Sequence, residues 1–197
     1  MADTLTPLSP LHGWDEKFSA LPASVRITEE PFVSMVDLWV DPSGPGGAAA
    51  GTALGVDLPT TPSTRVDNGE VTAVWLGSEE WLITTRSQSP EELETQLRNA
   101  VTPHGGAAID VSGQRTTIRL TGAHARDILA KGCSIDLHPK VFRPGSAVQT
   151  MLGLAGVVLI ALDDQGTDYR ILVRASFARY LAAWLIDAAE EFGVDPV

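Results

Sequence analysis

The feature that most constrains the fold is an order of short strands and helices that occurs twice along the chain. Residues 33–111 predict the order β-α-β-β-α-β, because strand-like apolar runs alternate with segments of helical spacing. Residues 115–192 predict β-α-β-β-β-α in the same way. Each is a split β-α-β unit, with helices packed on one face of an antiparallel or mixed sheet. The sequence therefore predicts an α+β fold of two consecutive ferredoxin-like halves.

Composition divides the chain into an arm and two units. Residues 1–24 contain three prolines and no sustained periodicity, which predicts an extended N-terminal arm. Residues 25–112 and 113–197 are then the first and second α+β units, packed into one compact body. The arm carries Leu11 and Trp14, which are apolar enough to need cover. Either they fold back onto the chain's own body, or they lie along a neighbouring protein.

The first unit contains strands and helices with recognisable ends. Apolar alternation predicts a strand over residues 33–40 and a hairpin over residues 71–86. Residues 45–54 predict a short helix, because proline lies in the first turn and glycine follows the end. Ser89 predicts the start of a stronger helix, since it can cap the helix and Glu92 can complete a capping box.

Residues 107–145 connect the two units and predict a strand, a turn, a second strand, a helix and a loop. The helix is expected over residues 123–131, with Thr121 as its N-cap and Gly132 as a C-terminal residue able to adopt positive φ. Residues 133–145 have no periodicity and predict a loop. The strand positions with apolar alternation are Ile109, Val111, Ile118 and Leu120. The expected anchors of the loop are Ile135, Leu137 and Phe142.

The chain then predicts three strands and a final helix. The strands are expected over residues 147–154, 156–162 and 169–174, with a polar turn at 163–168. Ser176 can cap the final helix. The apolar stripe of that helix contains Phe177, Tyr180, Leu181, Trp184, Leu185, Ala188 and Phe192.

The charge of the chain excludes some classes of partner. A formal net charge of −11, from 14 Lys+Arg against 25 Asp+Glu, disfavours binding to nucleic acid or to anionic membranes. No apolar run approaches the roughly 20 residues of a membrane helix, and the first residues do not form a signal peptide. The single cysteine fits a reducing compartment. We therefore expect a cytoplasmic protein.

The positive charges are concentrated in residues 115–143, which are locally +4 from six cations and two acids. These cations are Arg115, Arg119, Arg126, Lys131, Lys140 and Arg143. They are either solvated side chains on a strand and helix, or a contact surface for an acidic partner or anionic ligand.

No set of residues indicates catalysis. Cys133, Asp136 and His138 are too few for a zinc site, because no further Cys or His cluster completes them. The sequence contains no dinucleotide fingerprint, phosphate loop or serine-hydrolase elbow. Residues 163–168 lack the order of a calcium loop. We therefore predict no catalytic, cofactor-binding or metal-binding residue in this chain.

Several short sequence motifs occur together in a specific order. They are residues 8–11 (LSPL), 75–82 (WLGSEEWL), 110–117 (DVSGQRTT), 120–139 (LTGAHARDILAKGCSIDLHP), 142–145 (FRPG) and 174–181 (RASFARYL). Because it carries these motifs in this order, the chain resembles the gamma subunit of heterotetrameric sarcosine oxidase over nearly its whole length.

The resemblance implies a fold like that of the folate-binding aminomethyltransferases and membership of a four-subunit enzyme. Such complexes oxidise the methyl group of sarcosine at a flavin, form hydrogen peroxide and glycine, and pass the one-carbon unit to tetrahydrofolate. The resemblance places FAD, FMN, NAD and tetrahydrofolate in the larger alpha and beta subunits, and zinc in the small delta subunit. It assigns no catalytic residue to the gamma chain.

Two functions follow. The first is a non-catalytic assembly subunit of this complex. The alternative is a stand-alone folate-binding or one-carbon transfer protein, in which the basic residues hold the carboxylates of a folate. The expected partner contacts in the first case are Leu11, Trp14, Arg115, Arg119, Arg126, Lys140 and Arg143.

Overall fold

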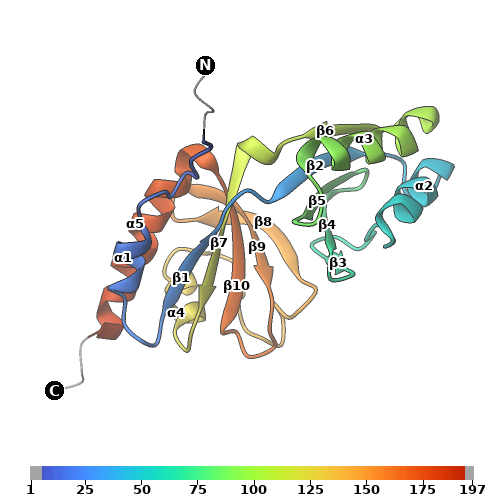
Figure 1. Ribbon diagram of the computed structural model, residues 1–197. Helices are drawn as coiled ribbons and strands as arrows, with labels where there is room; N and C mark the ends of the chain where they lie inside the picture. The colour runs from blue at the N-terminus through green and yellow to red at the C-terminus, as the bar shows by residue number, and fades with distance from the viewer. Residues whose placement is uncertain (1–5, 194–197) are drawn as a thin grey trace, which may run out of the picture.

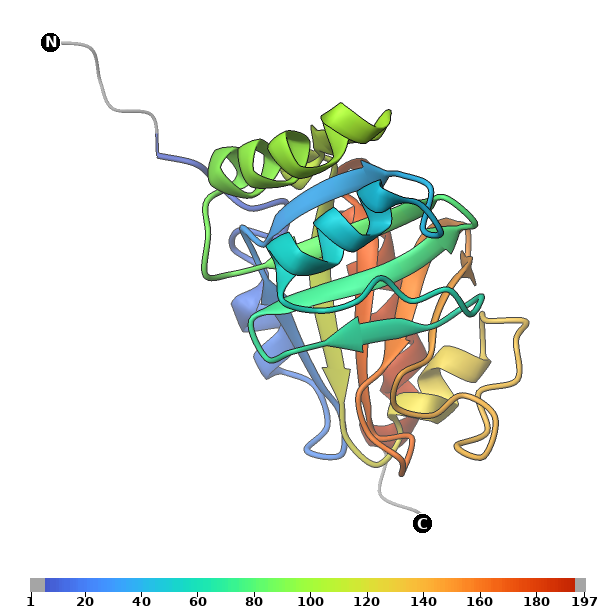
Figure 2. The same ribbon diagram turned by 90° about the vertical axis from the view of Figure 1, so that its right-hand side faces the viewer.

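A computed structural model describes residues 6–193 of the 197-residue chain. The first five residues of the predicted arm and the last four of the predicted second unit lie outside the described residues. Two five-stranded antiparallel sheets face each other, and helices cover the outer face of each sheet (Figure 1, Figure 2). This arrangement confirms the predicted α+β fold class.

The two sheets have different strand orders, and neither follows the order of the chain. Sheet A contains, in spatial order, β1 (Arg26–Glu30), β7 (Arg115–Thr121), β10 (Asp168–Arg174), β9 (Ala155–Ala161) and β8 (Ala147–Leu152). Sheet B contains β3 (Arg65–Asp67), β4 (Val71–Gly77), β5 (Glu80–Thr85), β2 (Ser34–Trp39) and β6 (Ala107–Asp110). Because side chains alternate between the faces of a strand, each sheet has one outer face and one inner face.

Helices bury the outer faces, and apolar side chains join the inner faces. Helices α2 (Pro45–Leu54) and α3 (Pro90–Val101) pack on sheet B, whereas α1 (Asp15–Ser19), α4 (Ala125–Ala130) and α5 (Ala178–Ala189) pack on sheet A. Short 3-10 segments lie at Thr102–His104, Ser112–Gln114, Ala175–Phe177 and Glu190–Gly193. The cluster between the sheets contains Met35, Val74, Leu82, Ala147, Val158, Ile160 and Leu172.

Three predicted features that rest on local sequence signals are present. The capping box of α3 is present: the Ser89 hydroxyl accepts from the Glu92 amide at 3.3 Å, and the Glu92 carboxylate accepts from the Ser89 amide at 2.9 Å. Gly55 ends α2 with φ of 67°. Leu137 and Phe142 are buried and anchor the loop over residues 133–145.

Strand β1 has a partner that the element order does not indicate. The sequence places residues 25–112 in the first unit, whereas β1 pairs with β7, so that Ile27 lies opposite Leu120. Both side chains are buried in the core of sheet A. A short apolar pattern predicts which face of a strand is buried, but not which sheet the strand joins. The predicted extended arm also contains the helical turn α1, whose Phe18 enters the same core.

The predicted ends of α4 differ from the observed ones. Thr121 is the last residue of β7, and α4 begins after His124 without a side-chain cap. Gly132 is not among the described glycines with positive φ. Its lack of a side chain serves packing instead, because a Cβ atom there would lie 2.5 Å from Cζ2 of Trp184.

Most of the predicted apolar stripe of α5 faces the core of sheet A: Leu181, Leu185 and Ala188 are buried there, and Trp184 and Phe192 pack against it. The departures are Phe177 and Tyr180. Phe177 precedes the helix and Tyr180 lies on it, and both are exposed, whereas small residues such as Ala178 and Ala182 lie fully buried against sheet A. Ser176 lies in the preceding 3-10 segment and does not cap the helix. Helical spacing predicts that one side of α5 is apolar, whereas close packing on a sheet selects the small side chains.

Candidate partner-contact surface

Four arginines lie side by side on the inner face of sheet A. Arg119 of β7 lies opposite Arg170 of β10, and Arg115 lies opposite Arg174. They share the face of Leu172, whose side chain packs between the two sheets. Like charges in directly opposed positions destabilise a sheet, so each pair requires compensating acids.

Bidentate ion pairs compensate the charges of Arg119 and Arg170. Nε and Nη2 of Arg119 donate to the Asp168 carboxylate at 3.0 and 2.7 Å. Nε and Nη2 of Arg170 donate to the Glu30 carboxylate at 2.6 and 3.2 Å. The hydrogen bonds to Asp168 raise the pKa of Arg119. The two ion pairs therefore hold β1, β7 and β10 together.

In the second pair, Arg115 lies near two acids of sheet B, Asp37 of β2 and Glu80 of β5. Burial and the charge of Arg174 lower the pKa of Arg115, while Asp37 and Glu80 act in the opposite direction. Burial and the charge of Asp37 raise the pKa of Glu80, against the effect of Arg115. Nε of Arg115 and Oδ1 of Asp37 are buried without a hydrogen-bond partner in the described part of the chain. Arg115 is thus half-buried next to charges of its own chain.

The other predicted basic contacts lie elsewhere. Arg126 is half-buried on α4, and Lys140 and Arg143 are exposed on the loop that follows it. In Figure 1, α4 follows the end of β7 that is remote from Arg115. The predicted basic window therefore divides into a sheet-face group and a loop group. Lys131 belongs to neither, because its ammonium pairs with Glu191 at 2.8 Å.

The predicted contacts of the arm pack against the chain's own body. Leu11 is 3% exposed and belongs to the core of sheet A, and Trp14 packs against the same core. The Ser9 hydroxyl donates to the Glu29 carboxylate at 2.6 Å, which fixes the arm on β1. Of the two arrangements open to the arm, the described residues adopt the folded-back one. The side chain of Leu11 is therefore covered by its own chain.

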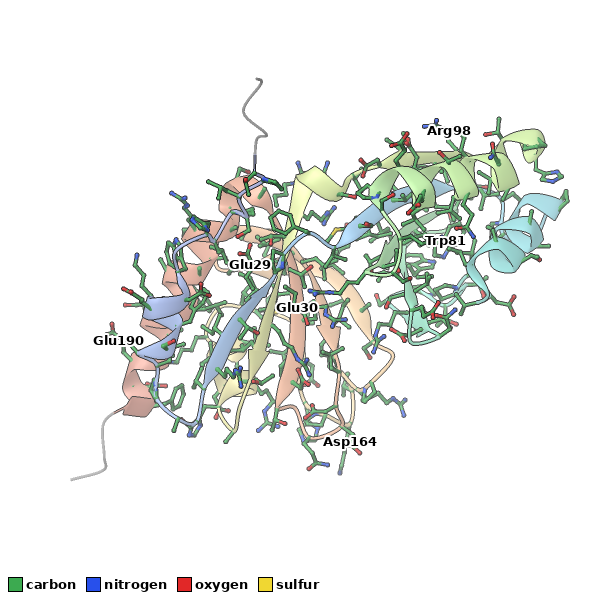
Figure 3. All side chains as sticks on the ribbon, in the orientation of Figure 1. Glu29, Glu30, Trp81, Arg98, Asp164 and Glu190 are labelled. Atoms are coloured by element: carbon green, nitrogen blue, oxygen red, sulfur yellow. The ribbon has the colours of Figure 1, made fainter. Side chains whose placement is uncertain are left out.

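Two cavities lie near the arginines. One of about 220 Å³ opens between the sheets, and its lining includes Glu30, Arg170 and Arg86. Another of about 480 Å³ lies where the arm passes the start of β7 and the end of β10; its lining includes Arg115 and Arg179. Figure 3 shows Glu29 and Glu30 at the crossing between the two sheets.

The residues considered for metal chemistry form a local turn. Cys133 is buried, and the Asp136 carboxylate accepts from the His138 amide at 2.9 Å. Residues 6–193 contain no group of three or more His, Cys, Asp or Glu side chains placed to hold a metal ion. Across the same residues, no helix has both the length and the apolar character of a membrane span.

Sequence reasoning missed half of the arginine cluster. Residues 170, 172 and 174 alternate onto one face of a predicted strand, which signals that Arg170 and Arg174 point the same way. Their pairing with Arg119 and Arg115 depends on which strand lies beside β10. The pattern of a single strand does not contain that information.

Comparison with known proteins identifies the family. A family model described as the sarcosine oxidase gamma subunit family matches residues 40–191. Sarcosine oxidase subunit gamma of Corynebacterium sp. (strain U-96) is 35% identical over 175 residues, which cover 88% of this chain and 83% of that protein. The subunit gamma of Corynebacterium sp. (strain P-1) is 36% identical over 177 residues, covering 88% and 84%.

Solved structures agree with these sequence relatives. A chain of the heterotetrameric sarcosine oxidase from Corynebacterium sp. U-96, in complex with pyrrole 2-carboxylate, superposes with a TM-score of 0.89 at 31% identity, covering 97% of this chain and 98% of that chain. Glycine cleavage system aminomethyltransferase T from Bartonella henselae superposes with a TM-score of 0.61 at 15% identity, covering 91% of this chain and 50% of that chain, and shares the fold. This chain belongs to the sarcosine oxidase gamma subunit family.

Proposed function

We propose that this chain is the non-catalytic gamma subunit of a heterotetrameric sarcosine oxidase, and that its role is assembly. The observation that carries the proposal is the superposition on a chain of such a complex over 97% of this chain. The arginines and acids of the inner faces support a structural role. Arg119 and Asp168, like Arg170 and Glu30, are bound to each other in bidentate pairs.

The complex would oxidise sarcosine to glycine, form hydrogen peroxide and pass the one-carbon unit to tetrahydrofolate. We place FAD, FMN, NAD and tetrahydrofolate in the alpha and beta subunits, and zinc in the delta subunit, within the cytoplasm. The gamma chain would contribute a folded surface to these partners and no reacting group.

A part of that surface is the loop group of cations. Lys140 and Arg143 are exposed, and Arg126 lies nearby on α4 in a chain whose net charge is −11. Exposed cations on an acidic protein suit an acidic neighbour and accelerate its association. Charge reversal at Lys140 and Arg143 should slow assembly at low salt, whereas an unchanged association rate would remove this part of the proposal. The acidic α3 helix provides a control site for reversal, at Arg98.

A second function is a stand-alone folate-binding or one-carbon transfer protein. The likeness of fold to an aminomethyltransferase favours it. Arg86 is the exposed cation of the cavity between the sheets, since the guanidinium of Arg170 already binds Glu30. Calorimetry of the isolated chain with tetrahydrofolate separates the two functions. Assembly alone predicts no micromolar binding, whereas the alternative requires it and predicts that Arg86→Ala abolishes it.

A further inference from the structure

The groove of about 480 Å³ beside the arm combines exposed apolar side chains with cations. Its apolar rim contains Leu8 and Phe32, which are 67% and 64% exposed. Its lining also includes Arg115, Arg179, Ser112 and Ser176. The lining residues come from the arm, the link between β1 and β2, the start of β7 and the start of α5, which converge near the top of Figure 1.

Phe32 occupies this rim in an unfavourable backbone conformation. Its φ is +57°, a left-handed value that bulky residues rarely adopt and that glycine adopts freely. The residue lies in the link where the chain leaves sheet A for sheet B. Its ring gains little burial in this chain in return for the strain. Strained residues of this kind gather at sites that clamp a ligand or partner.

The charge of the groove is opposite to that of the whole chain. Among the described residues that line it, two are cations and none is an acid. Arg174, which is exposed, precedes the lining residue Ala175 directly and adds a third positive charge at this end of sheet A. Glu29 lies behind the lining, where it accepts hydrogen bonds from Ser9 and Thr116 at 2.6 Å. Asp37 and Glu80 already act on the charge of Arg115, so Arg174 and Arg179 carry the positive charge that selects an anionic occupant in this chain of net charge −11.

We propose that this groove receives an extended acidic segment of a partner subunit, and this inference rests on the proposed assembly function. A carboxylate of the segment would lie at Arg179, and an apolar side chain would pack against Phe32 and Leu8. Arginine suits this role because its planar guanidinium binds carboxylates through two parallel hydrogen bonds. Aromatic and arginine side chains are also the residues that dominate the affinity of protein interfaces.

Two substitutions test the two halves of the groove separately. Phe32→Gly removes the ring and relieves the positive φ, so the melting temperature of the chain should stay the same or rise. Arg179→Glu reverses the charge, and it also removes the hydrogen bond from Arg179 Nε to the Pro10 carbonyl, 3.2 Å long. Matched controls are Trp39→Ala, at an aromatic side chain 45% exposed at the end of β2, and Arg98→Glu, on α3 at the upper right of Figure 3.

The measurement is the dissociation constant between the full-length chain and the other co-expressed subunits, at low and at high salt. Phe32→Gly should weaken binding about tenfold at both salt concentrations, without a lower melting temperature. Arg179→Glu should weaken binding by at least about tenfold at low salt and less at high salt, because salt screens the repulsion. Both controls should bind like the wild type.

The results separate failure of the groove from failure of the assembly function. If the wild-type chain binds its partners and Phe32→Gly or Arg179→Glu binds equally well, the groove proposal is overturned and the assembly function stands. If the wild-type chain itself does not bind, both proposals are overturned. Weaker binding of both groove variants, with unaffected controls, supports the acidic segment.

Discussion

The clearest test of the fold is the substitution Ile27→Ala in β1. Ile27 is 2% exposed and lies opposite the fully buried Leu120 of β7. The change removes three buried carbon groups at about 0.8 kcal/mol each and leaves a cavity, so the free energy of unfolding should fall by about 3 kcal/mol. That is a large part of the roughly 5–15 kcal/mol that stabilises a typical domain.

Urea denaturation followed by circular dichroism measures this loss. With an m-value of about 2 kcal/mol/M, the midpoint should shift by roughly 1.5 M. Arg26→Ala is the control in the same strand, because Arg26 is exposed on the opposite face and its loss should cost less than about 0.5 kcal/mol. A loss below about 1 kcal/mol for Ile27→Ala, or equal losses for both variants, would refute the burial of Ile27 in the core of sheet A.

Three further predictions concern single contacts. Gly132→Ala places a Cβ 2.5 Å from the Trp184 ring and should destabilise the chain by about 1–3 kcal/mol in thermal unfolding; an unchanged melting temperature would contradict the packing. Hydrogen bonds from the hydroxyl and amide of Thr167 lower the pKa of Asp163 against the effect of burial, so this carboxylate stabilises the fold above its unfolded pKa. Asp163→Asn should therefore cost about 1 kcal/mol at neutral pH, with a deficit that vanishes as pH falls through the folded pKa; a deficit independent of pH would count against it. Ser89→Ala removes the cap of α3 and should cost about 1 kcal/mol in urea denaturation, and a neutral effect would show that the capping box is dispensable.

Several features that depend on neighbouring residues in the sequence were predictable, although the predicted caps Thr121 and Ser176 do not cap their helices. The capping box of α3 involves residues three apart, and the helix forms where Ser89 and Glu92 indicate. The hairpin of β4 and β5 likewise forms close to its predicted bounds, because its turn and its apolar strands are contiguous. The order of such elements was enough to predict the α+β class.

Features that depend on distant residues were not predictable from one sequence. Glu30 and Arg170 form an ion pair across 140 residues, and nothing local to either side chain indicates the other. The same holds for β1, whose apolar residues would fit the core of either sheet. For the same reason, the predicted partner contacts do not form one surface. Arg115 and Arg119 lie on a sheet face whose neighbours are set by topology, whereas Lys140 lies on a loop.

The central claim is that this chain assembles with catalytic subunits and does not itself react with sarcosine. Its most direct test is to express the other three subunits with and without this chain, and to measure native mass and sarcosine-dependent peroxide formation of each preparation and of the isolated chain. We predict that the isolated chain forms no peroxide. Co-expression with the other subunits should yield a complex of defined mass that contains this chain in a fixed stoichiometry. Peroxide formation by the isolated chain, or a fully active complex whose mass excludes this chain, would contradict it.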